Sequence, residues 1–200
     1  MMLYARTRGM AVWAVTLAGT ALVAWWCAEW LIDTSRFGGA AGRVPVVSMA
    51  PLLAAAAVVG SLHVHGREIE ETAARRQWLW RAGQIVLGTA VSAAVLAATV
   101  LLDAAQFGAV AMARNVIGCV GLAALASVLL GARLSWLPLM LYATTVYLSA
   151  PRQAQGATIA WAWPTQPGPE PAAWAAAIAL FLVGSAACSW LGPRAPLGDE

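Results

Sequence analysis

The residues that could act in catalysis or hold a metal are few in this chain of 200 residues, and they lie far apart. His63 and His65 are the two histidines, and on one helix they would point about 200° apart, so they could not share a metal there. Ser48, Ser61 and Ser92 lie among apolar residues with no histidine at a comparable depth, so a Ser/His/Asp arrangement is not indicated. We therefore predict no catalytic site, no metal site and no cofactor, and we do not expect an enzyme.

Acidic and thiol side chains are also placed unfavourably for chemistry. Glu29 and Asp103 lie at the ends of apolar runs, and no carboxylate lies near the middle of one. Proton-coupled transporters and ion pumps use such buried acids, and a lipid-modifying enzyme would need paired acids or a histidine cluster. Cys27, Cys119 and Cys188 fall in three different runs without paired spacing, which favours small packing residues over a disulfide or metal site.

Composition indicates a membrane protein. The chain is 61% hydrophobic and 10% charged, whereas a soluble domain carries roughly 25% charged residues. The charges separate six apolar runs, each near the length that crosses hydrocarbon, at about residues 10–31, 45–63, 82–102, 116–130, 135–148 and 172–191. We predict an all-α, polytopic integral membrane protein with six transmembrane helices, built as one domain over residues 1–192 and followed by a disordered cytoplasmic tail at 193–200.

Two of these predictions leave alternatives. The run at 10–31 follows Arg6 and Arg8 as a signal peptide would, but it is too long for a signal core and no A-x-A-like site follows, so we interpret it as a retained helix. The runs at 116–130 and 135–148 are short. They form either a tight hairpin that crosses twice, which we favour, or one crossing and a partly inserted segment.

Arginine sets the expected orientation, because cytoplasmic loops carry the excess of basic residues. All twelve basic residues are arginine. With the N-terminus inside, the cytoplasmic side holds eight of them, Arg6, Arg8, Arg67, Arg75, Arg76, Arg81, Arg133 and Arg194. The outer side then holds four, Arg36, Arg43, Arg114 and Arg152. Both termini are thus expected in the cytoplasm of a bacterial cell, with the chain in the plasma membrane. No basic patch with interleaved aromatics indicates nucleic-acid binding.

The longest outer connection is rich in proline and tryptophan. It contains Trp161, Trp163 and Pro164 ahead of three further prolines. Proline breaks helices because it lacks a backbone N–H, and indole rings favour the membrane interface. We therefore predict an outer interfacial or re-entrant segment here.

The connection between the second and third runs, residues 66–81, is the most charged part of the chain. Gly66 ends the preceding helix, and Glu71 and Arg75 have the favourable i,i+4 order of a helical ion pair. The segment is either a solvated loop that anchors orientation or a short cytoplasmic helix that docks a partner, which we favour. The candidate docking residues are Arg67, Glu68, Glu70, Glu71, Thr72, Arg75 and Arg76.

At this segment the chain resembles the permease subunits of ABC-2-type transporters, and it is most similar in character to small actinobacterial permeases. Those permeases have about six helices, both termini in the cytoplasm, re-entrant elements before the last helix, and a short coupling helix in the first cytoplasmic loop. Residues 67–75 stand at the place of that helix. The resemblance implies an exporter powered by a separate cytoplasmic ABC ATPase, with a second permease chain and membrane lipid as further partners. This chain has no G-x-x-x-x-G-K-[ST] loop of its own.

The alternative is a stand-alone polytopic membrane protein without transport activity, such as an immunity factor, a sensor or an assembly factor. The small size of the chain motivates that interpretation. Neither hypothesis identifies a substrate.

Overall fold

The computed structural model describes residues 10–33, 44–62, 77–100, 107–131, 134–149 and 156–194. Within these ranges the chain forms seven α-helices and one short 3-10 helix, and it contains no strand, so the predicted all-α class is confirmed. The elements are α2 (Met10–Asp33), α3 (Val44–Gly60), α5 (Gln77–Ala98), α6 (Ala109–Leu130), α7 (Trp136–Ser149), α8 (Ala157–Trp161), η3 (Trp163–Thr165) and α9 (Pro171–Leu191).

Four of the described helices, α2, α5, α6 and α9, are long and apolar enough to cross a membrane. At 1.5 Å per residue, the 22 residues of α6 extend about 33 Å, which exceeds the ~30 Å of a hydrocarbon core. The 17 residues of α3 reach about 26 Å and the 14 residues of α7 about 21 Å. The chain therefore has the character of a helical membrane protein, while the count of six spans stays a prediction.

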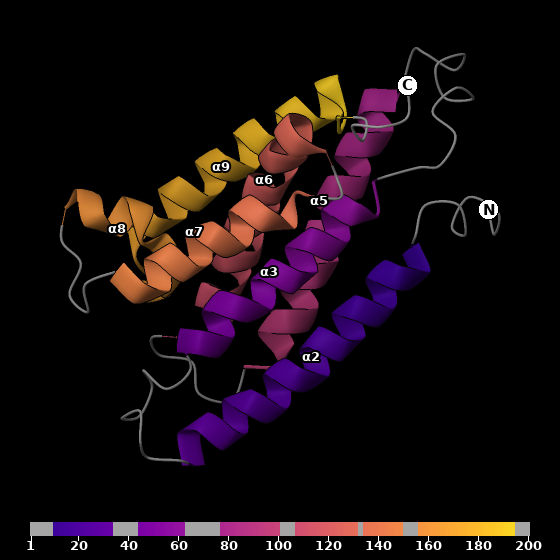
Figure 1. The fold of residues 1–200 in the computed structure, drawn as a ribbon. Helices are drawn as coiled ribbons and strands as arrows, with labels where there is room; N and C mark the ends of the chain where they lie inside the picture. The colour runs from indigo at the N-terminus through magenta and orange to yellow at the C-terminus, as the bar shows by residue number, and fades with distance from the viewer. Residues whose placement is uncertain are drawn as a thin grey trace.

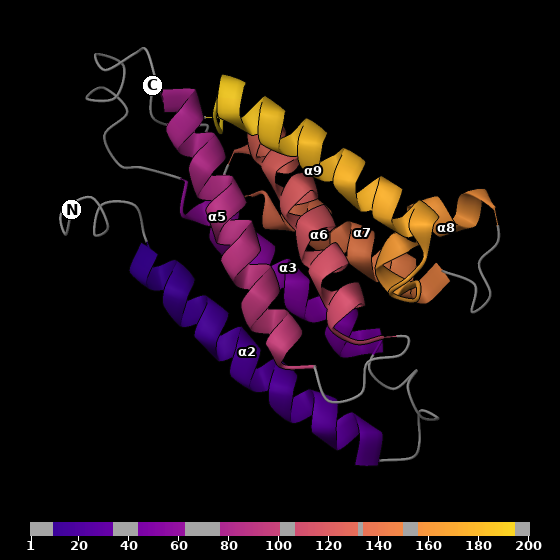
Figure 2. The same cartoon turned by 180° about the vertical axis from the view of Figure 1, so that it is seen from behind.

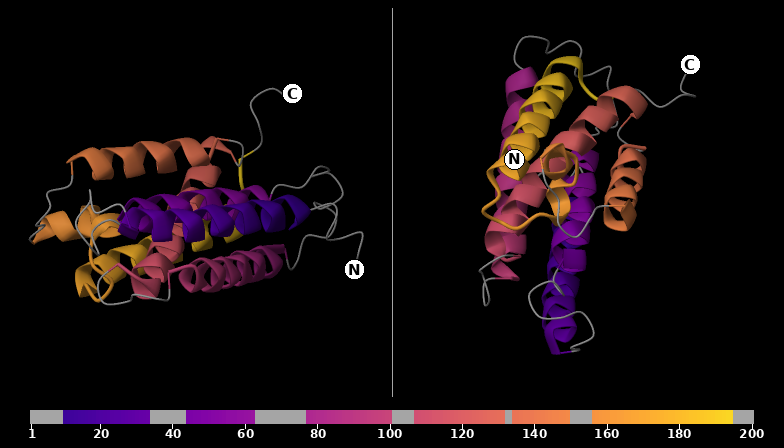
Figure 3. Two further views of the ribbon diagram at one scale, coloured as in Figure 1. Left: turned by 90° about the horizontal axis from the view of Figure 1, so that it is seen from below. Right: turned by 90° about the vertical axis from the view of Figure 1, so that its left-hand side faces the viewer.

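The helices pack around α6 (Figures 1 and 2). In the apolar 18-residue stretch of α6, 61% of the residues are buried. The corresponding stretch of α2, which lies at the edge of the bundle, has 17% of its residues buried. The closest packing is between α6 and α9, where Gly121 and Gly184 bring the two backbones together. α7 lies on the opposite side of the bundle from α5 (Figure 3). A central helix in contact with α3, α5, α7 and α9 is thus the scaffold on which any site of this fold is built.

The two ends of the bundle are distinct. The first turn of α2 and the last turn of α9 lie at one end, and α8 lies at the other (Figures 1 and 2). We call these the Arg194 end and the α8 end. Gly131 and Gly192 terminate α6 and α9 with φ of 86° and 71°, a region that favours glycine. The backbone N–H of Arg194 donates to Ser127 O at 3.1 Å, which fixes the end of α9 to the end of α6.

Exposed tryptophans mark both ends of the bundle. Trp78 and Trp80 lie in the first turn of α5, Trp136 begins α7 and Trp190 lies in the last turn of α9. Trp161 ends α8, and Trp25 and Trp26 lie in the C-terminal half of α2. Indole rings gather at the two interfaces of a membrane, because one edge of the ring is polar and its body is apolar. This distribution agrees with helices that run from one interface to the other.

Candidate functional site

The most polar part of the buried core lies on α6 near the α8 end. α6 begins at Ala109, whereas the apolar run predicted from the sequence begins at about residue 116. The earlier start places Arg114 and Asn115 inside the helix and within the bundle, both with 0% of their surface exposed. A buried arginine is costly unless its donors are satisfied, so its partners define the site.

The Arg114 guanidinium is held by backbone oxygens of the connection that leads into α9. Its Nη1 donates to Pro167 O at 2.6 Å and its Nη2 donates to Gln166 O at 2.7 Å. Its Nε donates to the side-chain Oδ1 of Asn115 at 3.1 Å. Glu170, just before α9, adds an electrostatic attraction to the same charge. The guanidinium charge therefore donates hydrogen bonds to neutral oxygens and is stabilised by the nearby carboxylate of Glu170.

Asn115 uses its amide to join two further elements. Its Nδ2 donates to Val47 O at 3.0 Å and to Pro164 O at 2.7 Å. Val47 lies one helical turn before Pro51, the proline inside α3. Because proline has no N–H, the carbonyl of Val47 receives no helical hydrogen bond from residue 51. Asn115 supplies the donor that Pro51 lacks.

We call Arg114, Asn115 and the oxygens they bind the Arg114–Asn115 clamp. The clamp joins α3, α6 and the connection at 164–167, and Ser48 Oγ of α3 also donates to Pro164 O at 3.4 Å. Irregular backbone is tolerated at membrane depth only where it is buried in protein and its polar groups are satisfied. The clamp supplies donors for three backbone oxygens of this connection, those of Pro164, Gln166 and Pro167.

The connection itself folds back into the bundle as α8 and η3. Trp163 is 1% exposed, and its ring lies against Gly118 of α6, where even a methyl group would overlap the indole. The ring also stacks with Tyr142 of α7, with 6.4 Å between ring centroids and 26° between planes. The Tyr142 hydroxyl donates to Trp161 O. Gly118 is thus required for the close approach of Trp163 to α6.

Among the sequence-predicted site residues, Trp163 and Pro164 are buried within the bundle and Trp161 is exposed at the end of α8. An interfacial position for this segment stays a prediction. The candidate docking residues Arg67, Glu68, Glu70, Glu71, Thr72, Arg75 and Arg76 lie outside the described residues.

The groups at the clamp are of kinds that position other parts of the chain. Its groups are a guanidinium, an amide, a hydroxyl and backbone carbonyls, and these hold backbone in place rather than attack or protonate a substrate. Within the described ranges, no group of three or more His, Cys, Asp or Glu side chains could hold a metal ion. The clamp therefore fixes the 156–170 segment against α6 and α3.

The apolar pattern predicts Arg114 on the outer side, before the run at 116–130, and it indicates no role for Asn115. A signal for both was present, because residues 109–113 are Ala-Val-Ala-Met-Ala, which continue the apolar helix on the N-terminal side of Arg114. A charged residue normally ends an apolar run, although a paired arginine can lie inside one. Comparison of the chain with known protein families, curated proteins and solved structures finds no match.

Proposed function

We propose that this chain is the membrane-spanning permease subunit of an ABC-2-type exporter, which moves a substrate across the cell membrane with energy from a separate ATPase subunit. The observation that carries the proposal is the 156–170 segment, which folds back into the bundle directly before the last helix. A re-entrant element at that place in the chain is a feature of the permeases that this sequence resembles.

The Arg194 end of the bundle is the proposed ATPase-facing side. α5 begins there at Gln77, with Arg81 one turn later, and Arg81 lies against Gly192 at the end of α9. Residues 63–76 lead into this end of α5, so a partner bound to them could push on α5 and, through Arg81, on α9. The arginine-rich sequence of this side agrees with a cytoplasmic position.

Transmission to the other side would pass through α6, because α6 contacts α3, α5, α7 and α9. At the α8 end, the Arg114–Asn115 clamp ties α6 to α3 and to the 164–167 backbone. A shift of α6 relative to α3 would therefore strain the clamp and move the re-entrant segment. A second permease chain would complete the route for the substrate.

The proposal is tested by purifying the chain from its native membrane in a gentle detergent and identifying the proteins that co-elute. We expect a stoichiometric nucleotide-binding subunit. Replacing Glu68, Glu70 and Glu71 with alanine should lower the recovery of that subunit or uncouple its ATP hydrolysis from this chain.

The matched control removes two acids from the C-terminal tail by Asp199→Ala and Glu200→Ala, which should leave the complex intact. Repeated recovery of this chain without an ATPase, or equal recovery with both sets of substitutions, would contradict the permease assignment. The stand-alone membrane protein would then be the better description.

A further inference from the structure

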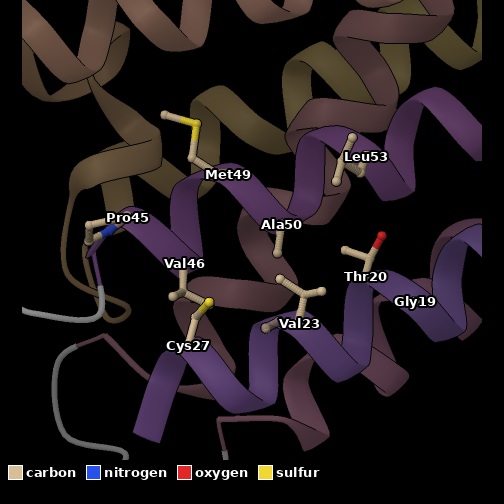
Figure 4. A pocket seen from close by; sticks show the side chains of 10 residues that line it. Gly19, Thr20, Val23, Cys27, Pro45, Val46, Met49, Ala50 and Leu53 are labelled. Atoms are coloured by element: carbon tan, nitrogen blue, oxygen red, sulfur yellow. The ribbon is translucent and has the colours of Figure 1, made fainter. Parts of the chain in front are cut away.

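A cavity of about 390 Å³ lies between α2 and α3 (Figure 4). It extends from Gly19 to Cys27 along α2 and from Pro45 to Leu53 along α3. Eight residues of helix correspond to about 12 Å, so the cavity is a groove that follows both helix axes. Its volume falls within the roughly 300–1,000 Å³ of typical ligand sites.

The walls of the groove are almost entirely apolar. The hydroxyl of Thr20 is already used, because its Oγ1 donates to Thr16 O of its own helix at 2.7 Å. A buried water needs two to four polar partners, and these walls do not offer them. An empty groove would leave the wall atoms without dispersion contacts. The occupant should therefore be apolar.

The groove opens at the surface of the bundle. Val23 and Leu53 line it and are 61% and 48% exposed, although both are large apolar side chains. α2 is one of the helices long enough to span a membrane, and it packs against the bundle through α3 and α5. The exposed Trp25 and Trp26 precede Cys27 in α2, and indole rings favour the level of the lipid headgroups.

We propose that this groove binds one acyl chain of a membrane lipid, with the headgroup at the α8 end near Trp25 and Trp26. An acyl chain is apolar and thin, and it can extend along the axes of α2 and α3 as the groove does. A helix of a second copy is about 10 Å across and could place only side-chain tips in the groove. The proposal is independent of the transport function, because it needs neither an ATPase nor a substrate.

The test uses the full chain in lipid nanodiscs that contain, as a minor component, phosphatidylethanolamine with a diazirine in one acyl chain. After illumination, mass spectrometry locates the adducts. We expect more label on Val23, Cys27 and Met49, which line the groove, than on Leu87 and Leu141, which are exposed elsewhere on the bundle.

A filling substitution gives the matched comparison. A Cβ on Gly19 would meet nothing within 4 Å, so Gly19→Leu can place its side chain in the groove without a backbone clash. Gly83 of α5 is equally open but lies outside the groove, so Gly83→Leu is the control. We expect Gly19→Leu to lower groove labelling about tenfold, which corresponds to roughly 1.4 kcal/mol, and Gly83→Leu to leave it unchanged.

The proposal would be overturned if Leu87 and Leu141 carried as much lipid adduct as the groove residues. It would also be overturned if a folded Gly19→Leu variant carried as much adduct in the groove as the unaltered chain. Efficient cross-linking of Cys27 to Cys27 between two chains, without lipid adducts in the groove, would assign the groove to a second copy instead. If Gly19→Leu does not fold, Ala50→Leu can fill the same groove from α3. The positions of the lipid adducts on the unaltered chain also test the proposal without any substitution.

Discussion

Replacing Asn115 with leucine tests whether the clamp fastens the 156–170 segment to the bundle. Leucine has the same branching and the same number of side-chain heavy atoms as asparagine, so it leaves no cavity, and the overpacking cost of its bulkier methyl groups cancels in the comparison with the Pro51→Ala background below. The substitution removes the two hydrogen bonds that Nδ2 donates to Val47 O and Pro164 O, and the one that Oδ1 accepts from Arg114. The loss of stability then reports hydrogen bonding rather than a cavity.

The expected loss follows from these three bonds. At about 0.6 kcal/mol each, the average for hydrogen bonds between helices in membranes, they contribute about 2 kcal/mol. The carbonyl of Val47 raises this figure, because Pro51 cannot donate to it and a buried acceptor left without a partner costs about 1–3 kcal/mol. We therefore expect Asn115→Leu to lower the free energy of unfolding by about 3 kcal/mol.

Pro51 provides an internal check. Pro51→Ala restores an N–H that can donate to Val47 O, so Asn115→Leu should cost about 1 kcal/mol less in that background. The four proteins of this cycle would be unfolded reversibly in mixed detergent micelles and followed by tryptophan fluorescence. Limited proteolysis would show whether residues 156–170 become accessible before the rest of the bundle.

The control is Thr145→Val, which removes a hydroxyl that bonds only Leu141 O of its own helix on an exposed face. That change should be within about 0.5 kcal/mol of the unaltered chain. Equal costs of Asn115→Leu with and without Pro51 would refute the role assigned to Val47 O. An unaltered cleavage pattern at 156–170 would refute the fastening role of the clamp.

Two further predictions concern packing and thiol access. A Cβ on Gly184 would overlap the backbone of α6, so Gly184→Ala should separate α6 from α9 and lower the free energy of unfolding by about 2 kcal/mol. The control Gly19→Ala meets open space and should leave the free energy of unfolding unchanged or raise it slightly. Both variants are measured by the same unfolding titration. Cys27 is half-buried, whereas Cys119 and Cys188 are buried. A maleimide should therefore modify one thiol in the folded protein and three after unfolding. Modification of all three thiols in the folded protein would contradict the packing around α6 and α9.

The long helices were the predictable part of this fold. The runs expected at 10–31 and 172–191 lie within α2 and α9, because uniform apolar stretches of spanning length leave the backbone few alternatives to a helix. The burial of Trp163 could not be predicted in the same way. It depends on Gly118, which lies 45 positions earlier (163 − 118) and leaves the space that the indole fills.

The clamp was missed because each of its parts looks unfavourable when considered alone. A buried arginine, a proline inside α3 and a proline-rich connection each leave polar groups that an apolar environment cannot satisfy. Together they are complementary, because Pro51 frees the Val47 carbonyl, the connection presents the oxygens of Pro164 and Pro167, and Arg114 and Asn115 supply the donors. Each segment considered alone would bury polar groups without partners, which costs free energy. In the fold, these groups are partners for one another. The donors on α6 and the acceptors on α3 and the connection therefore depend on each other. A substitution on either side should therefore weaken the remaining hydrogen bonds of the clamp as well as remove its own.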